Sequence, residues 1–227
     1  MSRGSLGRRC AAEVLATFAL VFAGCGAIVV NSENDGTLGE LGIAGAFGLV
    51  IMAMIYATGH VSGAHMNPAV TLSFVALRHF PARDALGYVP AQLAGAVAGA
   101  LVLRIAWDGT PADLGATVPS VGTWAAFLYE FVLTALLMFV VVAVATDVRA
   151  VGSAAAIAIG GTVALDALVG GQVTGASMNP ARSFGPALVA GQWDDFWLYA
   201  VAPPLGALAG GLCYVFVRAG GPEPAQP

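Results

Sequence analysis

Two nearly identical eight-residue strings, each ending in Asn-Pro-Ala, constrain the architecture of this chain more than any other feature. They are Ser62-Gly-Ala-His-Met-Asn-Pro-Ala69 and Thr174-Gly-Ala-Ser-Met-Asn-Pro-Ala181, which lie 112 residues apart. A second pair, Glu13-Val-Leu-Ala-Thr17 and Glu130-Phe-Val-Leu-Thr134, repeats at an offset of 117 residues. The chain therefore consists of two related halves.

Six long apolar stretches accompany these strings. Hydrophobic residues make up 58% of the chain and charged residues only 10%, whereas soluble domains carry about 25% charged residues. A membrane-spanning helix needs roughly 20 mostly apolar residues. The sequence therefore predicts an all-α membrane protein in a lipid bilayer, with spanning helices at residues 10–30, 41–59, 86–106, 123–146, 150–169 and 197–218.

The repeat predicts that the two halves are inverted relative to each other. Each half, at about residues 8–106 and 123–218, holds three spans, and because three is odd the second half must enter the membrane from the opposite side. In inverted repeats the functional site lies between the halves, near the bilayer midplane. We expect a single domain over residues 1–227, in which residues 219–227 form a disordered tail.

Two segments, at about 67–78 and 179–189, are too short to cross the membrane. Each begins at Asn-Pro: proline suits the first turn of a helix, and the preceding asparagine, Asn67 or Asn179, is a strong N-cap. Two re-entrant half-helices that enter from opposite faces meet N-terminus to N-terminus at the midplane. Their dipoles then create a positive potential that opposes cations, protons included.

The backbone that leads into each Asn-Pro-Ala must be non-helical. At membrane depth such backbone is tolerated only where it is buried or lines a watery cavity. Its carbonyl groups are therefore expected to act as hydrogen-bond acceptors along a pore, and they belong to Gly63, Ala64, His65, Met66, Gly175, Ala176, Ser177 and Met178.

The arginines predict the orientation of the chain. All nine basic residues are arginines, and a cytoplasmic N-terminus places seven of them on the cytoplasmic side, as the positive-inside rule requires. We expect a multi-pass protein of the cell (inner or plasma) membrane with both termini in the cytoplasm. Arg104 can extend its long side chain to the interface. Arg182 lies inside the second half-helix, where an arginine costs several kcal/mol, and this cost favours a functional role.

Three features resemble the aquaporin, or major intrinsic protein, family over about residues 8–218. They are the doubled motif Asn67-Pro68-Ala69 and Asn179-Pro180-Ala181, the string Met178-Asn-Pro-Ala-Arg-Ser-Phe-Gly-Pro186 and the paired Glu-x-x-x-Thr. The resemblance implies a right-handed bundle of six helices and two half-helices, and a homotetramer with one water-filled pore per subunit. It also implies that Asn67 and Asn179 donate hydrogen bonds to permeating water, and that Glu13 and Glu130 accept bonds from the backbone of the re-entrant loops.

The family spacing places the selectivity filter at Phe47, Ala167, Ala176 and Arg182. Strict water channels carry histidine at the position of Ala167. Glycerol facilitators pair a tryptophan with the arginine and follow it with aspartate, where this chain has Phe47 and Ser183. The pattern is closer to the nodulin-like branch and its bacterial relatives. It implies a passive channel for water and small neutral solutes (glycerol, urea, and metalloid hydroxides such as arsenous or boric acid) that excludes protons and ions; a strictly water-selective aquaporin is the alternative.

Three other polar residues have less defined roles. His65 is expected to support the first loop, and His60 at the inner end of the second span is either a gating residue or a structural histidine. Asp166 precedes a filter residue and is expected to turn toward the second loop, with Gln172 or backbone N–H groups as partners. A weaker hypothesis is that the charge of Asp166 offsets that of Arg182.

Other classes of function find less support. A coupled secondary transporter also uses inverted repeats, but it needs titratable groups on the solute path, and the intramembrane acids Glu13 and Glu130 are assigned to the scaffold. A junction protein without conductance would have a plugged pore. No nucleophile–base pair, metal-ligand spacing, phosphate loop or basic patch is present, so we expect no enzyme activity, no metal or cofactor and no nucleic-acid partner.

The cysteines add little to these predictions. Cys10, Cys25 and Cys213 are odd in number and indicate no disulfide framework. Phe22-Ala-Gly-Cys25 after a basic N-terminus resembles a lipoprotein signal peptide. The repeat argues against that reading, because it uses residues that cleavage would remove.

Overall fold

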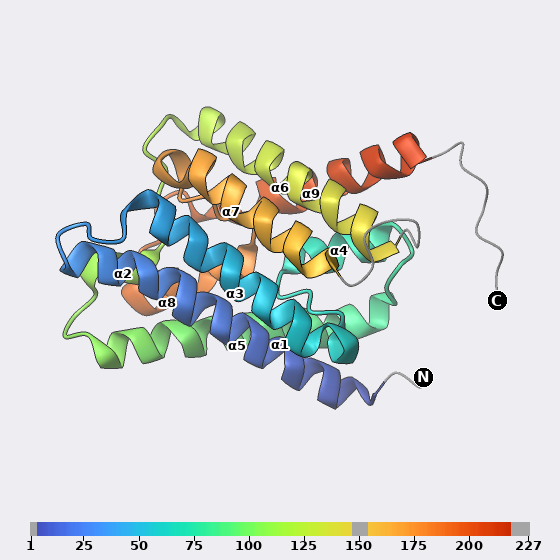
Figure 1. The fold of residues 1–227 in the computed structure, drawn as a ribbon, viewed down its shortest axis with the longest axis horizontal. Helices are drawn as coiled ribbons and strands as arrows, with labels where there is room; N and C mark the ends of the chain where they lie inside the picture. Colours follow the sequence, from blue (N-terminus) through green and yellow to red (C-terminus); the bar gives the residue numbers. More distant parts are fainter. Residues whose placement is uncertain (1–3, 147–153, 219–227) are drawn as a thin grey trace.

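The computed structural model describes residues 4–146 and 154–218, which are almost entirely helical (Figure 1). Six helices in this range are long and apolar enough to cross a membrane: Leu6–Glu33, Gly39–Ser62 (α3), Ala82–Ala106 (α5), Thr123–Thr146 (α6), Ala155–Thr174 (α7) and Phe196–Arg218 (α9). The first of them comprises α1 (Leu6–Leu20), a π-helical turn η1 (Val21–Cys25) and α2 (Gly26–Glu33). The predicted all-α bundle of six spans is confirmed. The predicted tail at 219–227 and residues 150–153 of the predicted fifth span lie outside the described residues.

Helices α3 and α7 extend beyond their predicted ends at residues 59 and 169, to Ser62 and Thr174. Both are terminated by a glycine in the left-handed conformation, Gly63 with φ of 89° and Gly175 with φ of 81°. A left-handed glycine is a common way to end a helix. The apolar character falls off before these glycines, and for that reason the hydropathy pattern predicted ends that are too early.

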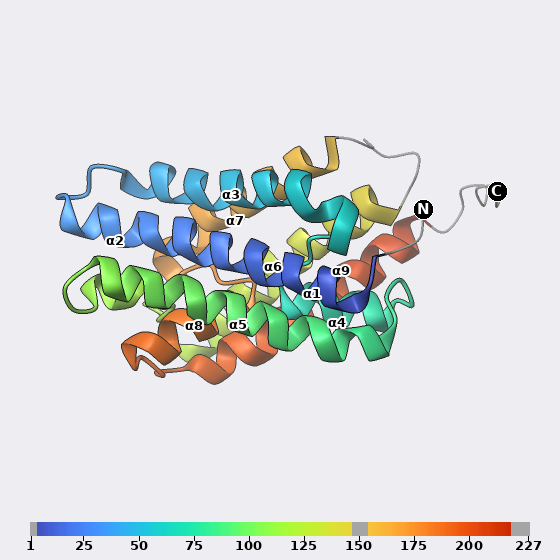
Figure 2. The ribbon, with the colours of Figure 1, turned by 90° about the horizontal axis from the view of Figure 1, so that it is seen from below.

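The two half-helices form as predicted, as α4 (Pro68–Ala76) and α8 (Pro180–Ala190). Each has proline in its first turn and is capped by the asparagine before it, Asn67 or Asn179. In Figure 2, α4 lies toward the end of the bundle where α1 begins and α9 ends, and α8 lies toward the opposite end. The half-helices therefore enter from opposite ends, as an inverted repeat requires.

The helix crossings repeat as well. A Cβ atom on Gly95 of α5 would lie 2.3 Å from the Val14 carbonyl oxygen of α1, and one on Gly206 of α9 would lie 2.2 Å from the Phe131 carbonyl oxygen of α6. One turn further on, Gly99 and Gly210 make the same kind of approach, to the carbonyl oxygens of Phe18 and Ala135. Small residues allow this close packing between membrane helices.

Candidate functional site

A cavity of about 320 Å³ runs between the two re-entrant loops at the centre of the bundle. It shares wall residues with two further cavities. One, of about 430 Å³, lies at the end where α1 begins, and the other, of about 340 Å³, lies at the end where α2 meets α3. We call these the inner and outer vestibules. Together the three cavities trace a path through the bundle.

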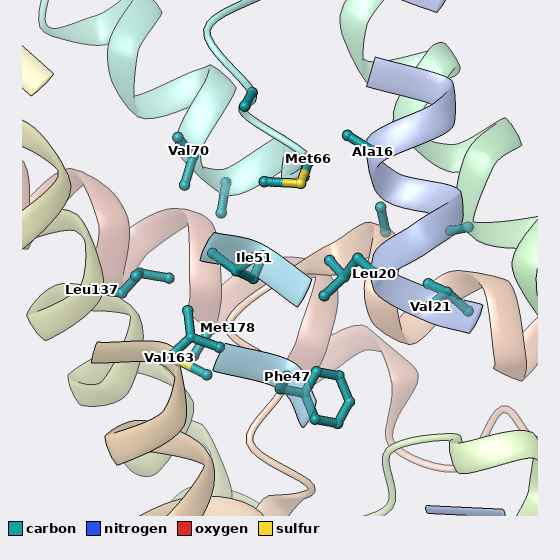
Figure 3. Packing of buried hydrophobic residues seen from close by; sticks show 14 of the residues in the cluster. Ala16, Leu20, Val21, Phe47, Ile51, Met66, Val70, Leu137, Val163 and Met178 are labelled. Carbon is teal, nitrogen blue, oxygen red and sulfur yellow. The ribbon is translucent and has the colours of Figure 1, made fainter. Parts of the chain in front are cut away.

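The wall of the central cavity is mostly apolar. Figure 3 shows the side chains of Leu20, Ile51, Leu137 and Val163 projecting from four separate helices into the region between Met66 and Met178 of the two loops. Polar groups reach this cavity from the loops and half-helices, and they include Asn67, Asn179 and Arg182. Apolar walls with a few placed polar groups are typical of small-molecule sites.

Asn67 and Asn179 link the two loops at the middle of the cavity. The Oδ1 atom of Asn67 accepts a 2.8 Å bond from the Ala69 N–H, and its Nδ2 atom donates a 2.8 Å bond to the Met178 carbonyl. Asn179 mirrors this arrangement: it accepts from the Ala181 N–H at 3.0 Å and donates to the Met66 carbonyl at 2.8 Å. An amide NH₂ group has two N–H donors, so each asparagine retains a second donor beside the cavity.

The loops that lead into the half-helices have unusual backbone conformations. Positive φ values occur at Ala64 (49°), Met66 (52°), Ala176 (41°) and Met178 (52°). Such conformations in residues other than glycine cost free energy and gather at functional sites. Of the eight residues whose carbonyls are predicted to face a pore, seven line the central cavity; the eighth, Gly175, lines the outer vestibule. The carbonyls of Met66 and Met178 also hold the asparagine side chains.

Glu13 of α1 secures the first loop. This fully buried residue receives hydrogen bonds from the Ser62 hydroxyl at 2.7 Å, the His65 N–H at 2.9 Å and the Met66 N–H at 2.7 Å. The Gln92 amide of α5 adds a fourth, at 2.9 Å. Hydrogen bonds to an ionised acceptor are the strong ones, so this carboxylate stabilises the strained backbone of the loop.

Glu130 of α6 secures the second loop in the same way. It is also fully buried and receives bonds from the Thr174 hydroxyl at 2.7 Å, the Ser177 N–H at 2.8 Å and the Met178 N–H at 2.8 Å. Tyrosines at matching positions, Tyr88 and Tyr199, donate to the Ser62 and Thr174 carbonyls at 2.7 Å each. The tyrosines repeat at an offset of 111 residues, a signal in the sequence that was missed.

Arg182 lies almost fully buried at the start of α8, with 2% of its surface exposed. Its Nη1 atom donates a 2.6 Å bond to the Gly115 carbonyl, and its Cζ atom lies 4.9 Å from the centroid of the Phe47 ring. Within residues 4–146 and 154–218, its Nε and Nη2 atoms have no hydrogen-bond partner. The guanidinium group is thus held at one nitrogen, and its Nε and Nη2 atoms are buried beside the cavity that Arg182 lines.

The turn that carries Gly115 was not predicted. Residues Pro111–Gly115 (η2) form a turn whose members Ala112, Asp113 and Leu114 all have positive φ, between 47° and 54°. The hydroxyl of Thr117, just after it, donates to the Ser183 hydroxyl at 2.8 Å. Glycine and proline in this segment signal a turn in general, but no local pattern identifies Gly115 as the partner of Arg182.

The four residues predicted to form a filter converge at the outer end of the central cavity. Phe47 of α3, Ala167 of α7 and Ala176 of the second loop line both this cavity and the outer vestibule, and Arg182 lines the cavity. This is therefore where the two spaces join. The junction is thus lined by two alanines and an aromatic ring, and that ring lies against the arginine.

Other predicted residues lie away from this junction. His60 is exposed and lines the inner vestibule, together with His65. His65 contacts the Thr71 hydroxyl at 3.0 Å and packs against Phe74, Phe80 and Tyr88. The predicted pairing of Asp166 with Gln172 is wrong.

The amide of Gln172 donates to Glu40 of α3 instead, because Gln172 lies at the outer vestibule whereas Asp166 is buried in the bundle. The Oδ2 atom of Asp166 has no hydrogen-bond partner among the described residues. Those residues also contain no cluster of three or more His, Cys, Asp or Glu side chains that could hold a metal ion.

Comparisons with known proteins agree with this geometry. The sequence model of the family described as "Major intrinsic protein" matches residues 1–214. The chain is 47% identical to nodulin-26 of Glycine max over 207 residues, which cover 91% of this chain and 76% of that protein. It is 51% identical to aquaporin NIP1-4 of Oryza sativa subsp. japonica over 207 residues, with the same two coverages.

A third relative and a solved structure extend the comparison. Aquaporin NIP6-1 of Arabidopsis thaliana is 47% identical over 214 residues, covering 94% of this chain and 70% of that protein. The X-ray structure of the aquaglyceroporin from Plasmodium falciparum superposes with a TM-score of 0.82 at 27% sequence identity, covering 92% of this chain and 96% of that one.

Proposed function

This chain belongs to the major intrinsic protein family as an integral, multi-pass channel of the aquaporin type, and on that premise we propose that it conducts water together with small neutral solutes. Glycerol, urea and metalloid hydroxides such as arsenous or boric acid are the solutes proposed, and protons and ions are excluded. The observation that carries this breadth is the junction of the cavity and the outer vestibule, where the small residues Ala167 and Ala176 line both spaces and Arg182 lines the cavity.

Two small side chains at this junction leave room for a solute larger than water. An imidazole in place of Ala167 would project into the same space and add a polar contact. The Nε and Nη2 atoms of Arg182 are buried without a hydrogen-bond partner among the described residues, and Arg182 and the loop residues line the cavity. We propose that the guanidinium group and the loop carbonyls supply hydrogen bonds to hydroxyl or amide groups of a solute. The apolar face formed by Phe47 contacts the carbon side of such a molecule.

The exclusion of protons and ions is proposed from the centre of the path. There the N-termini of α4 and α8 point toward each other, and their dipoles place positive potential at the point where Asn67 and Asn179 lie. Each asparagine has an amide N–H that is not needed for the loops. A water molecule that accepts from both directs its own hydrogens outward, and a chain of proton transfers is interrupted there.

Orientation and assembly are further parts of the proposal. Arg8, Arg9, Arg78 and Arg83 lie near the inner vestibule end, which supports a cytoplasmic N-terminus by the positive-inside rule. We propose a homotetramer in the cell membrane, as the family resemblance implies, in which each subunit has its own pore through the cavity at the centre of its bundle.

A permeability panel tests the proposed breadth. The purified protein and its Ala167→His variant are reconstituted in liposomes, and stopped-flow light scattering follows water, glycerol and urea, while arsenous acid entry is followed by its accumulation in the vesicles. We expect wild type to pass all four and the variant to retain water while losing the larger solutes. A wild-type protein with fast water flux that excludes the other three solutes would be strictly water-selective and would end the proposal.

A further inference from the structure

The first span contains a π-helical turn, η1 (Val21–Cys25), that its counterpart in the second half lacks. The offset of 117 residues aligns this span with the fourth, and α6 runs through the equivalent positions as a regular α-helix from Thr123 to Thr146. Single π turns inside helices occur frequently at functional sites. This turn lies at the level of the outer filter.

Gly24 of the π turn lies directly against the ring of Phe47. A Cβ atom on Gly24 would be 2.3 Å from Cε1, 2.5 Å from Cδ1 and 2.8 Å from Cζ of that ring. Carbon atoms pack at about 3.5–4.0 Å, so the ring occupies the space that a side chain at residue 24 would need. The absence of a side chain lets Phe47 lie back against the first span.

The next residue, Cys25, lies behind the other side of the filter. A Cβ atom on Gly115 would lie 2.9 Å from the Cβ of Cys25, so the backbone of Gly115 packs on this side chain. The Gly115 carbonyl in turn holds Nη1 of Arg182 at 2.6 Å. Two consecutive residues of one π turn therefore pack behind the two large residues of the filter. Gly24 contacts Phe47 directly, and Cys25 contacts Gly115, which binds Arg182.

The inner half of the path lacks this arrangement. By the repeat offsets, Gly24 corresponds to Val141, Phe47 to Ile159 and Arg182 to Val70, and all three counterparts line the cavity. At these matched positions, the outer side pairs a glycine with an aromatic ring and the inner side does not. The inner side has three β-branched aliphatic residues there, Val141, Ile159 and Val70, which are similar in size to one another.

We propose that the π turn sets the aperture of the filter and that Gly24 is a specificity-determining residue, which acts by positioning the Phe47 ring. Only 7% of the surface of Phe47 is exposed, and the residue lines both the central cavity and the outer vestibule. A ring displaced from Gly24 therefore moves into the path. The choice of solutes for the test rests on the proposed function, while the displacement itself does not.

The direct test is Gly24→Ala, measured in liposomes and normalised to the amount of folded protein. We expect the glycerol and urea permeability per channel to fall at least about tenfold, equivalent to about 1.4 kcal/mol in the barrier, with a smaller loss for water. Gly45→Ala is the matched control, because a Cβ there meets no atom within 4 Å although it lies on the same helix as Phe47. The control should behave as wild type.

A second variant shows whether the ring causes the effect. Gly24→Ala/Phe47→Val lacks the Cδ, Cε and Cζ atoms that the new methyl group would meet, and we expect it to regain glycerol and urea flux relative to Gly24→Ala. If Gly24→Ala alone is not recovered as folded protein, a folded and permeable double variant supports the proposal. A failure of both variants to fold contradicts it, because the clash would then not involve the ring.

The remaining outcomes are equally informative. A glycerol-to-water ratio in Gly24→Ala within about twofold of wild type, or a folded double variant that does not recover, overturns the positioning role. If the wild-type protein itself excludes glycerol and urea, the proposed breadth fails. The role of Gly24 is then tested by water flux alone, which should fall in Gly24→Ala and return in the double variant.

Discussion

The side chain of Asn179 reaches across the repeat to Met66, where its Nδ2 atom donates a 2.8 Å hydrogen bond to the backbone carbonyl. Asn67 makes the reciprocal bond to Met178, also at 2.8 Å. The two half-helices are thus tied to each other's loops at the point where their N-termini meet. This cross-link fixes both amide groups, so that the donor left on each keeps a constant direction in the path.

Replacing Asn179 with aspartate tests the barrier to cations. The substitution keeps an oxygen that caps α8, and a negative charge at a helix N-terminus is favourable, so we expect the protein to fold. It also removes the donor to Met66 and places an acceptor with negative charge at the centre of the path. We expect a proton leak, measured with a pH-sensitive dye inside liposomes, that is absent from the control Asn34→Asp at an exposed loop. Equal, negligible leaks in both variants would contradict this account.

Glu130→Gln tests the support of the second loop. The carboxylate of Glu130 receives three hydrogen bonds, and the amide of glutamine cannot accept on both of its ends. Hydrogen bonds to charged groups contribute about 1.5–3 kcal/mol each, so we expect a clear fall in the midpoint of thermal unfolding in detergent, together with lower water flux. Glu40→Gln is the control, since Glu40 is exposed and pairs only with the side chain of Gln172 among the described residues. A larger loss in the control than in Glu130→Gln would refute the scaffold role.

Gly210→Ala tests the helix crossing that both halves share. The new methyl carbon would lie 2.0 Å from the Ala135 carbonyl oxygen, so α9 and α6 must separate. Overpacking of this kind costs about 1–3 kcal/mol, and we expect lower thermal stability in detergent. At Gly161 a Cβ meets nothing within 4 Å, and Gly161→Ala should leave the unfolding midpoint unchanged. The prediction fails if the two variants unfold at the same temperature.

Asp166→Asn tests whether a buried carboxylate with an unpartnered oxygen lowers the thermal stability of the protein. A charge buried without a partner is unfavourable, and the neutral amide removes it. We expect the unfolding midpoint to rise and the ratio of glycerol to water permeability to stay the same. A changed ratio would instead support the hypothesis that the charge of Asp166 offsets that of Arg182.

The features that were predictable from the sequence are those with local signals. The half-helices follow from Asn-Pro at their starts and the spans from apolar stretches. Each of these signals lies within a few residues of the feature that it predicts. The scaffold role of Glu13 and Glu130 was not local: it was implied by the family resemblance, together with their repetition 117 residues apart. The ends of α3 and α7 were predicted at residues 59 and 169, before the observed ends at Ser62 and Thr174. The observed ends depend in each case on the left-handed conformation of the glycine that follows.

The features that were not predictable depend on contacts between distant segments. The left-handed turn before Gly115 matters because its carbonyl meets Arg182, 67 residues further along the chain. The π turn at Gly24 matters because the ring of Phe47 packs on it. Neither residue carries a side chain, so neither could be recognised as part of a filter by its chemistry.

The central claim is that the filter admits solutes larger than water, and glycerol entry tests it most directly. Liposomes that contain the wild-type protein are shrunk in a glycerol gradient, and their re-swelling is compared with that of protein-free liposomes. The account predicts re-swelling faster by at least about tenfold, a barrier lower by about 1.4 kcal/mol. Rapid shrinkage by water loss, followed by re-swelling no faster than in protein-free liposomes, would contradict it.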